Sequence, residues 1–166
     1  MIRQSRFGIL PWTLTAFAAL FAAFGSALGV EVDVAEATQA AIGLSKAADS
    51  TDTRIYDLES RQTSREGRVS DLRSRSVVLR GFSDRLAQFA KTNLVTGSFI
   101  DVGECQKMLG DCHGALLDLR REARKLPAEA RKGLLKDVMA SFKRVERALY
   151  GQNGRYPIPH DPLLDA

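Results

Sequence analysis

The stretch VAEATQAAIGLSKAADSTDTRIYDL, residues 34–58, decides the fold of this chain. Its apolar residues recur at alternating steps of three and four, the heptad spacing of a helix that packs along one seam. The same phase continues without a slip as far as Ala90. The a and d positions of the pattern are Val34, Ala37, Ala41, Leu44, Ala48, Thr51, Ile55, Leu58, Gln62, Arg65, Val69, Leu72, Ser76, Leu79, Ser83, Leu86 and Ala90. This spacing predicts a long helix, or a pair of helices, with a coiled-coil-like seam.

The start and the weak points of this helix are also visible in the residues. Asp33 can cap the first turn, and Glu36 three residues later completes a capping box. The polar cluster at residues 49–53 and the interior glycines, among them Gly67, weaken the helical pattern. We therefore expect either one continuous helix over residues 33–93 or a break near residues 49–53.

Two positions of the seam are strongly polar. Gln62 occupies an a position and Arg65 the following d position. Polar seam residues cost stability but determine which register and which partner a coiled coil accepts. We expect Gln62 and Arg65 to set the register and partner of this helix.

Two further apolar stripes follow along the chain. Asp101 with Glu104 forms a second capping-box pattern, and Pro127 is expected to open the last helix. The first stripe comprises Val102, Cys105, Leu109, Cys112, Leu116, Leu119, Ala123 and Leu126. The second comprises Leu135, Val138, Phe142, Val145 and Leu149, and it ends at Gly151. Because no stretch alternates at period two for the length of a strand, residues 30–150 are predicted to form an all-α, antiparallel helical bundle.

The C-terminal residues 151–166 differ in composition from the helices. They contain Pro157, Pro159 and Pro162, which cannot be accommodated inside a helix. We expect an extended segment that either lies on the bundle or reaches for a partner.

Residues 1–29 have the features of an export signal. Arg3 and Arg6 precede an uncharged run that ends in small residues, and cleavage is expected after Ala27 or Gly29. The remainder would then be periplasmic or otherwise exported. If the run is kept as an anchor instead, the positive charges before it and the acidic residues after it predict a single-pass inner-membrane protein with a periplasmic domain.

The charges give a weak indication of the partner. The 24 lysines and arginines exceed the 20 acidic residues by four, and removal of Arg3 and Arg6 with the leader reduces the excess to two. Residues 31–60 are acidic and residues 61–91 are basic, as expected of neighbouring helices that pair, and the basic stretch could also meet an anionic membrane surface. Aromatic residues are poorly interleaved with the arginines, so no nucleic acid is expected as a partner.

The two cysteines suggest a disulfide, because the chain is predicted to reach an oxidising compartment. On one continuous helix, Cys105 and Cys112 would lie about 10.5 Å apart, too far for a disulfide bond. A bridge inside the chain therefore requires a turn at Gly110-Asp111. The alternatives are pairing with another chain and two reduced thiols.

The same segment also allows a soft-metal site. Cys105, Met108 and Cys112 share one helical face, His113 follows, and thiolate with thioether ligands favours Cu(I). Attachment of a c-type haem is excluded because the required Cys-x-x-Cys-His spacing has Leu109 at its first cysteine position. No motif for another cofactor is present, so none is expected.

No catalytic motif is found: the chain lacks nucleophile-elbow, zinc-protease and phosphate-loop patterns, and its two histidines stand in no familiar catalytic spacing. The sequence therefore predicts a non-enzymatic bacterial envelope protein. It would act as a structural or assembly component through helix–helix contacts with a protein partner or with itself, for example in a secretion or conjugation apparatus. The alternative is a periplasmic bundle that binds a metal or small ligand through the segment from Cys105 to His113.

Overall fold

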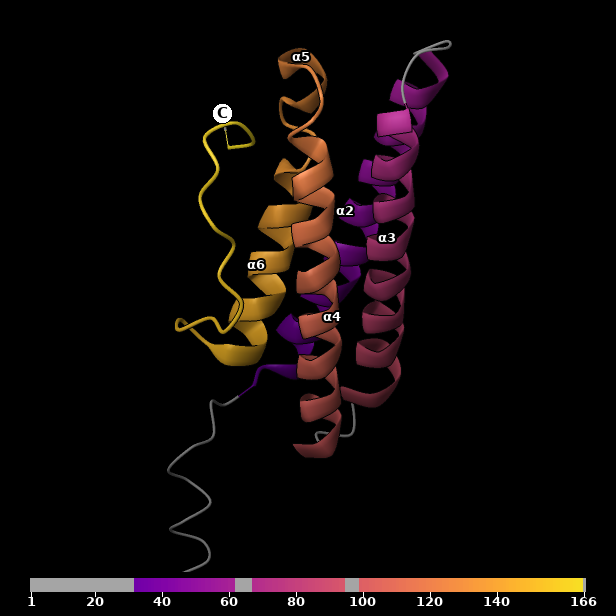
Figure 1. Cartoon of the computed structure of the whole chain (residues 1–166). Helices are drawn as coiled ribbons and strands as arrows, with labels where there is room; N and C mark the ends of the chain where they lie inside the picture. Colours follow the sequence, from indigo (N-terminus) through magenta and orange to yellow (C-terminus); the bar gives the residue numbers. More distant parts are fainter. Residues whose placement is uncertain (1–31, 62–66, 95–98, 166) are drawn as a thin grey trace, which may run out of the picture. The chain divides into compact units, whose positions relative to one another are not determined.

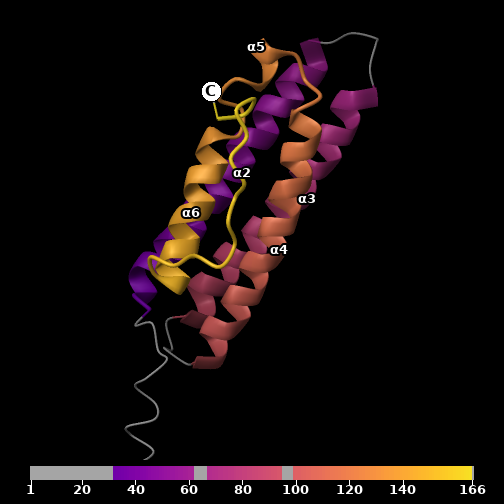
Figure 2. The same ribbon diagram turned by 60° about the vertical axis from the view of Figure 1, so that its left-hand side comes forward.

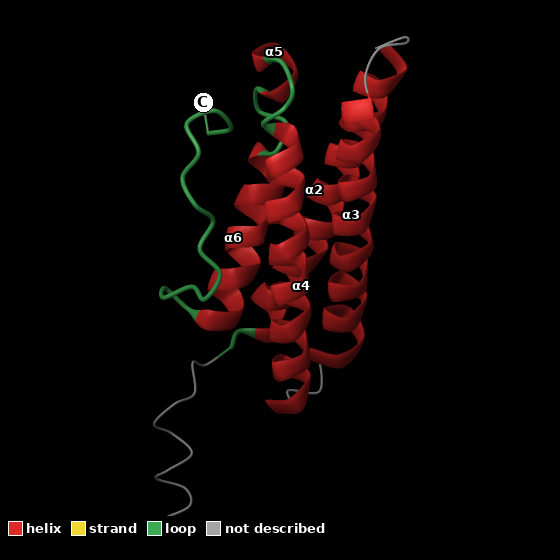
Figure 3. Cartoon of the chain, viewed as in Figure 1, coloured by secondary structure: helices red, strands yellow, loops and turns green. Residues whose placement is uncertain are grey.

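The computed structural model describes residues 32–61, 67–94 and 99–165, within a compact unit that begins at Val32. This part of the chain contains helices and loops, and its described residues include no strand (Figure 3). The helices are α2 (Val34–Arg61), α3 (Gly67–Asn93), α4 (Phe99–Ala123), α5 (Ala128–Arg131) and α6 (Lys136–Tyr150). The expected all-α fold is confirmed.

The four long helices form an antiparallel bundle in which successive helices run in opposite directions (Figure 1). Helix α3 packs between α2 and α4, and α6 packs on α2 and on α4. The short α5 lies at the end of the bundle where α4 ends and α6 begins (Figure 1). Each long helix thus has two helical neighbours.

The heptad phase predicted which side chains are buried. Every a and d residue from Ala37 to Ile55 and from Val69 to Ala90 is buried, and Val34 and Leu58 at the ends of α2 are partly buried. The stripes of α4 and α6 are buried in the same core. The seam of the sequence pattern is therefore the contact line between helices.

The expectation of one continuous helix over residues 33–93 is wrong, because α2 ends at Arg61 and α3 packs back against it. The alternative of a break at residues 49–53 is also wrong. Thr51 donates a hydrogen bond from Oγ1 to the Ala47 carbonyl at 2.9 Å, and Asp52 pairs with Arg80 of α3. These polar side chains find partners within the helical geometry, so the cluster does not end α2.

The segment that joins α2 to α3 lies outside the described residues. Gln62 and Arg65 fall in it, as the leader at residues 1–29 falls before Val32. Their predicted roles in register, partner choice and export remain predictions.

The last helix starts later than expected. Pro127 precedes the short α5, and Gly133 follows with a φ of 64°, a left-handed conformation that interrupts the helix before α6 begins at Lys136. At the other end, Gly151 has a φ of 74° and its N–H donates to the Arg147 carbonyl at 2.8 Å. The predicted stop at Gly151 is confirmed.

The C-terminal segment lies on the bundle. From Gly151 the chain turns back and runs alongside α6 and α4 toward α5 (Figure 2). We call residues 151–165 the C-terminal strap. Of the two expectations for this segment, the structure selects contact with the bundle.

Candidate functional site

The two cysteines occupy core positions of an unbroken helix. Helix α4 continues through Gly110 and Asp111, so the turn that an internal disulfide requires does not form. Cys105 and Cys112 are both free thiols with no exposed surface. The expectation of a ring across residues 105–112 is therefore wrong, because the helical rise keeps the two residues apart.

Burial also makes these thiols unreactive. It raises the pKa of the Cys105 thiol to about 12. Burial likewise raises the pKa of the Cys112 thiol to about 12, and the nearby Ser83 side chain opposes that shift only in part. Because the thiolate is the nucleophile, neither cysteine is suited to nucleophilic attack at neutral pH.

The predicted metal ligands are not brought together. His113 faces α6 and the strap: its ring centroid lies 5.7 Å from that of Phe142, and its Nε2 lies 3.2 Å from the Pro157 carbonyl oxygen. Cys112 instead lies beside Ser83 of α3. Met108 packs partly buried against the core. Among the described residues no group of three His, Cys, Asp or Glu side chains is arranged to hold a metal. Metal binding by Cys105, Met108, Cys112 and His113 stays a prediction.

The strap is held first by its aromatic residue. The Tyr156 ring packs against Gly110 of α4, with a centroid distance of 5.3 Å to the His113 ring on one side and 5.8 Å to the Tyr150 ring on another. Any side chain at residue 110 would occupy the space of the Tyr156 hydroxyl. A glycine on α4 therefore makes room for the strap.

A buried carboxylate holds the same part of the strap. Glu146 is only 2% exposed and accepts a hydrogen bond from the Tyr156 N–H. Its other partner is Lys143, whose Nζ lies 3.0 Å from Oε2. Gly154 passes so close that a Cβ there would lie 2.6 Å from the Glu146 carboxyl carbon. The Glu146 carboxylate therefore has a structural role: it holds the strap against α6.

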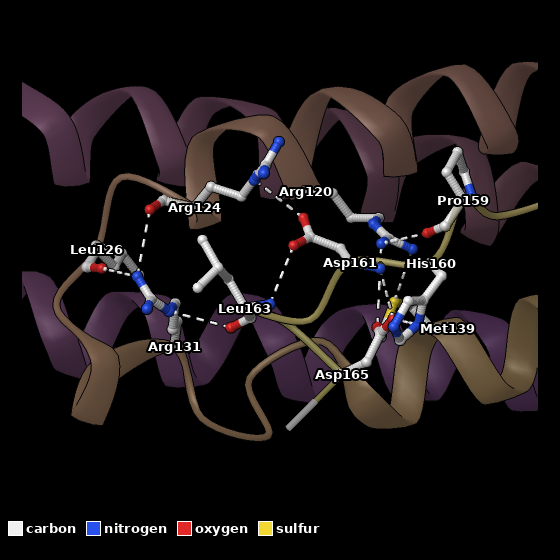
Figure 4. Close-up of polar contacts among 10 residues, drawn as sticks. All are labelled: Arg120, Arg124, Leu126, Arg131, Met139, Pro159, His160, Asp161, Leu163 and Asp165. Carbon is white, nitrogen blue, oxygen red and sulfur yellow. Dashed lines mark hydrogen bonds and ion pairs between the residues drawn. The ribbon is translucent and has the colours of Figure 1, made fainter.

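Arginines of α4 and α5 hold the rest of the strap (Figure 4). Arg120, 5% exposed, donates to the Pro159 carbonyl at 2.7 Å. Arg124 pairs with Asp161 at 3.0 Å, and Arg131 donates to the Leu163 carbonyl at 3.1 Å. The basic block that ends α4 therefore pairs with the strap, which the heptad pattern did not reveal. The signal in the sequence was the two acidic residues of the proline-containing segment, Asp161 and Asp165.

Two hollows beside the strap are lined by no serine, threonine or cysteine. One, of about 320 Å³, has Arg120, Lys143, His160 and Asp165 among its lining residues, and no serine, threonine or cysteine. His160 pairs with Asp165 at 2.9 Å, but its side chain is 80% exposed. None of the residues that line this hollow offers a hydroxyl or thiol that the His160–Asp165 pair could activate as a nucleophile.

The pairing of α2 with α3 follows the charge blocks. Arg80 Nη1 lies 2.5 Å from Asp52 Oδ2, and Arg73 Nη1 lies 2.8 Å from Glu59 Oε2. The acidic and basic segments therefore cross-pair as predicted. These contacts use only the side of α3 that faces α2.

The opposite side of α3 is uncovered. Val77 and Val78 are 45% and 46% exposed, although both are large apolar residues. The charged residues beside them, Asp71, Arg75 and Arg85, are exposed and make no ion pair with any residue that the structure describes. We call the line of Asp71, Val78 and Arg85, which follow at intervals of seven residues, the outer face of α3; Arg75 and Val77 flank it on opposite sides. The signal in the sequence was two adjacent valines off the heptad seam.

In the described part of the chain, no helix has both the length and the apolarity to cross a membrane. Comparisons of the chain with protein-family models, with curated proteins and with solved structures give no match.

Proposed function

We propose that this chain is a non-enzymatic, exported bacterial envelope protein that works as a structural or assembly component through helix–helix contacts. A secretion or conjugation apparatus is an example of such an assembly. The observation that carries the proposal is on α3, where two adjacent valines remain about half exposed on a helix that packs between α2 and α4.

The energetics favour a partner on this face. Complete burial of one exposed valine side chain contributes about 1.5–3 kcal/mol. Because Val77 and Val78 are each about half exposed, a partner that covered both would gain a comparable free energy. Single exposed apolar residues are ordinary, but Val77 and Val78 are consecutive, and Asp71 and Arg85, one heptad to either side of Val78, make no ion pair with a described residue. An apolar centre with a charged rim is the usual composition of a protein interface.

The rest of the molecule supports a structural role. The thiols are buried, the His160–Asp165 pair lies in solvent, and Arg124, just after α4, and Arg131 of α5 hold the strap. No geometry favours the alternative of a metal- or ligand-binding bundle, because His113 and Cys112 face different helices.

The proposal is tested with the full chain in a Gram-negative bacterial host. The cell fraction and the intact mass of the chain report export and removal or retention of the leader. A photo-crosslinking amino acid at residue 78 reports contacts of the outer face, and the matched control carries it at the exposed Lys107 of α4.

We expect the protein in the envelope or periplasmic fraction, with adducts from residue 78 and few from residue 107. A full-length chain that stays in the cytoplasmic fraction would contradict the proposal, as would equal or absent adducts at both positions.

A further inference from the structure

We propose that the outer face of α3 binds the same face of a second copy of this chain. The two α3 helices lie antiparallel about a two-fold axis at Val78, and Asp71 of each copy faces Arg85 of the other. This inference rests on the proposed function, because it names the partner of that assembly.

The positions of three residues point to this arrangement. Asp71, Val78 and Arg85 follow at intervals of seven on one continuous helix. Seven residues turn a helix through almost two full rotations, so the three side chains lie on one line within about 20° per step. The acid and the base stand at equal distances of about 10.5 Å on either side of Val78.

Equal spacing makes the line complementary to itself. When a second α3 is placed antiparallel with Val78 opposite Val78, residue 71 of one copy meets residue 85 of the other. The two-fold axis generates this pair twice, as in an isologous interface. A parallel arrangement would place acid against acid and base against base.

The charges of this line are available for a partner. Asp71 and Arg85 are exposed, and neither makes an ion pair with a residue in the described parts of the chain. Their neighbours differ: Arg80 pairs with Asp52, and Asp84 accepts a hydrogen bond from Ser45 of α2. The side of α3 toward α2 is thus satisfied by ion pairs and hydrogen bonds within one copy. On the outer line, the Arg85 guanidinium lies 4.6 Å from the centroid of the Phe82 ring of its own copy, and no described carboxylate pairs with it.

The centre of the line is apolar and open. Val77 and Val78 are about half exposed, and Phe82 is partly buried against the core of its own copy. Gly81 is exposed, and a Cβ there would meet nothing within 4 Å, so the fold of one copy does not require a glycine at this point.

The test is an exchange of charges in the full chain, with association followed by sedimentation velocity over a concentration series. Asp71→Arg places arginine against Arg85, and Arg85→Asp places aspartate against Asp71, so each variant alone should weaken self-association about tenfold or more. A mixture of the two variants restores both pairs in a heterodimer and should associate as the wild type does. Asp111→Arg, a charge reversal at an exposed residue of α4, is the matched control and should leave association unchanged.

A second measurement reports the register. Val78→Cys places two thiols at the proposed axis and should give an interchain disulfide on mild oxidation. Gln88→Cys places them about 30 Å apart in the same arrangement and should not. The native cysteines do not interfere, because both are buried.

The inference is overturned if the two charge variants associate as the wild type does, if their mixture fails to recover, or if Gln88→Cys crosslinks as readily as Val78→Cys. A chain that is monomeric in every form, but gives an adduct with a different protein from residue 78 in cells, would overturn the second copy as partner and leave the proposed function standing. Absence of any association would overturn both.

Discussion

The Tyr156 ring of the C-terminal strap rests on the bare backbone of Gly110, with its hydroxyl oxygen 2.9 Å from the position that a Cβ of residue 110 would take. Residues 46 positions apart in the sequence are thereby packed at van der Waals distance. A substitution at this contact therefore tests whether packing of the strap contributes to the stability of the protein.

Gly110→Ala should destabilise the protein by about 1–3 kcal/mol, because the rigid Tyr156 ring has to move as a unit to admit the methyl group. Gly114→Ala, one turn further along α4, is the matched control. A Cβ at Gly114 meets nothing within 4 Å, so that change should stabilise the helix by about 0.5–1 kcal/mol. Chemical denaturation measures both, and limited proteolysis of the strap should accelerate only for Gly110→Ala. Equal stabilities of the two variants would contradict this packing.

Glu146→Ala should cost about 1–3 kcal/mol, since it removes the acceptor of the Tyr156 N–H and leaves that donor without its partner beneath the strap. Glu146→Gln keeps an acceptor oxygen of similar shape and should cost less. The comparison uses urea unfolding together with hydrogen exchange at Tyr156. If the two variants are equally unstable, the charge and not the hydrogen bond is what the strap requires.

The protein should lose stability as the pH rises between about 9 and 12. Burial raises the pKa of the Cys105 and Cys112 thiols from 9.0 to about 12, so over this range the unfolded chain has released protons that the folded chain still holds. The contribution of the two thiols is fully present below pH 9 and disappears as the pH passes the folded values. Urea midpoints measured from pH 8 to 11 check this.

The double variant Cys105→Ala with Cys112→Ala separates the thiols from other groups that titrate in alkali. It should be less stable than the wild type at pH 8, because methyl-sized side chains fill the core less well, but its midpoint should depend less on pH. An unchanged dependence would assign the alkaline loss to other residues. Thiol reagents should label the native wild type slowly and the unfolded chain fast.

Arg80→Leu should destabilise the contact of α2 with α3 by about 1–3 kcal/mol, because the Asp52 side chain is only 14% exposed and would be left unpaired. Arg73→Leu is the control, since its pair with Glu59 is more exposed and should be worth less than about 1 kcal/mol. Thermal unfolding of both variants at low and high salt tests the difference. Equal losses would mean that the burial of Asp52 does not matter.

Much of the fold could be predicted because helix periodicity is a local property. Residues three and four apart share a face, so the apolar residues from Ala37 to Ala90 identified the buried seam before any neighbour was known. The stop at Gly151 is similarly local, since it depends on one residue with a positive φ. For the same reason the cap at Asp33 is confirmed: its Oδ1 accepts the Glu36 N–H at 3.0 Å. The Glu36 carboxylate does not complete the capping box, because it accepts hydrogen bonds from Arg144 of α6.

Tertiary structure decided where the long seam breaks and what each polar residue does. The cluster at residues 49–53 could end a helix in isolation, but Arg80 of α3 supplies a partner for Asp52 and the helix continues to Arg61. Gly110-Asp111 could form a turn, but the core on both sides of it keeps α4 straight and the cysteines apart. In each case a contact from elsewhere in the chain outweighs a weak local preference.

The strap and the outer face of α3 also combine a feature that the sequence predicts with a position that only the tertiary structure decides. The prolines predicted an extended segment, but its place on α4 and α6 depends on Gly110, Glu146 and Arg120, which no sequence period links to it. Val77 and Val78 became informative only once their helix was seen to pack between α2 and α4. The sequence by itself determined which residues repeat along each helix, because that repeat is set by the geometry of one turn. Which faces meet, and which remain open, was decided only by the assembled bundle, because burial depends on every helix at once.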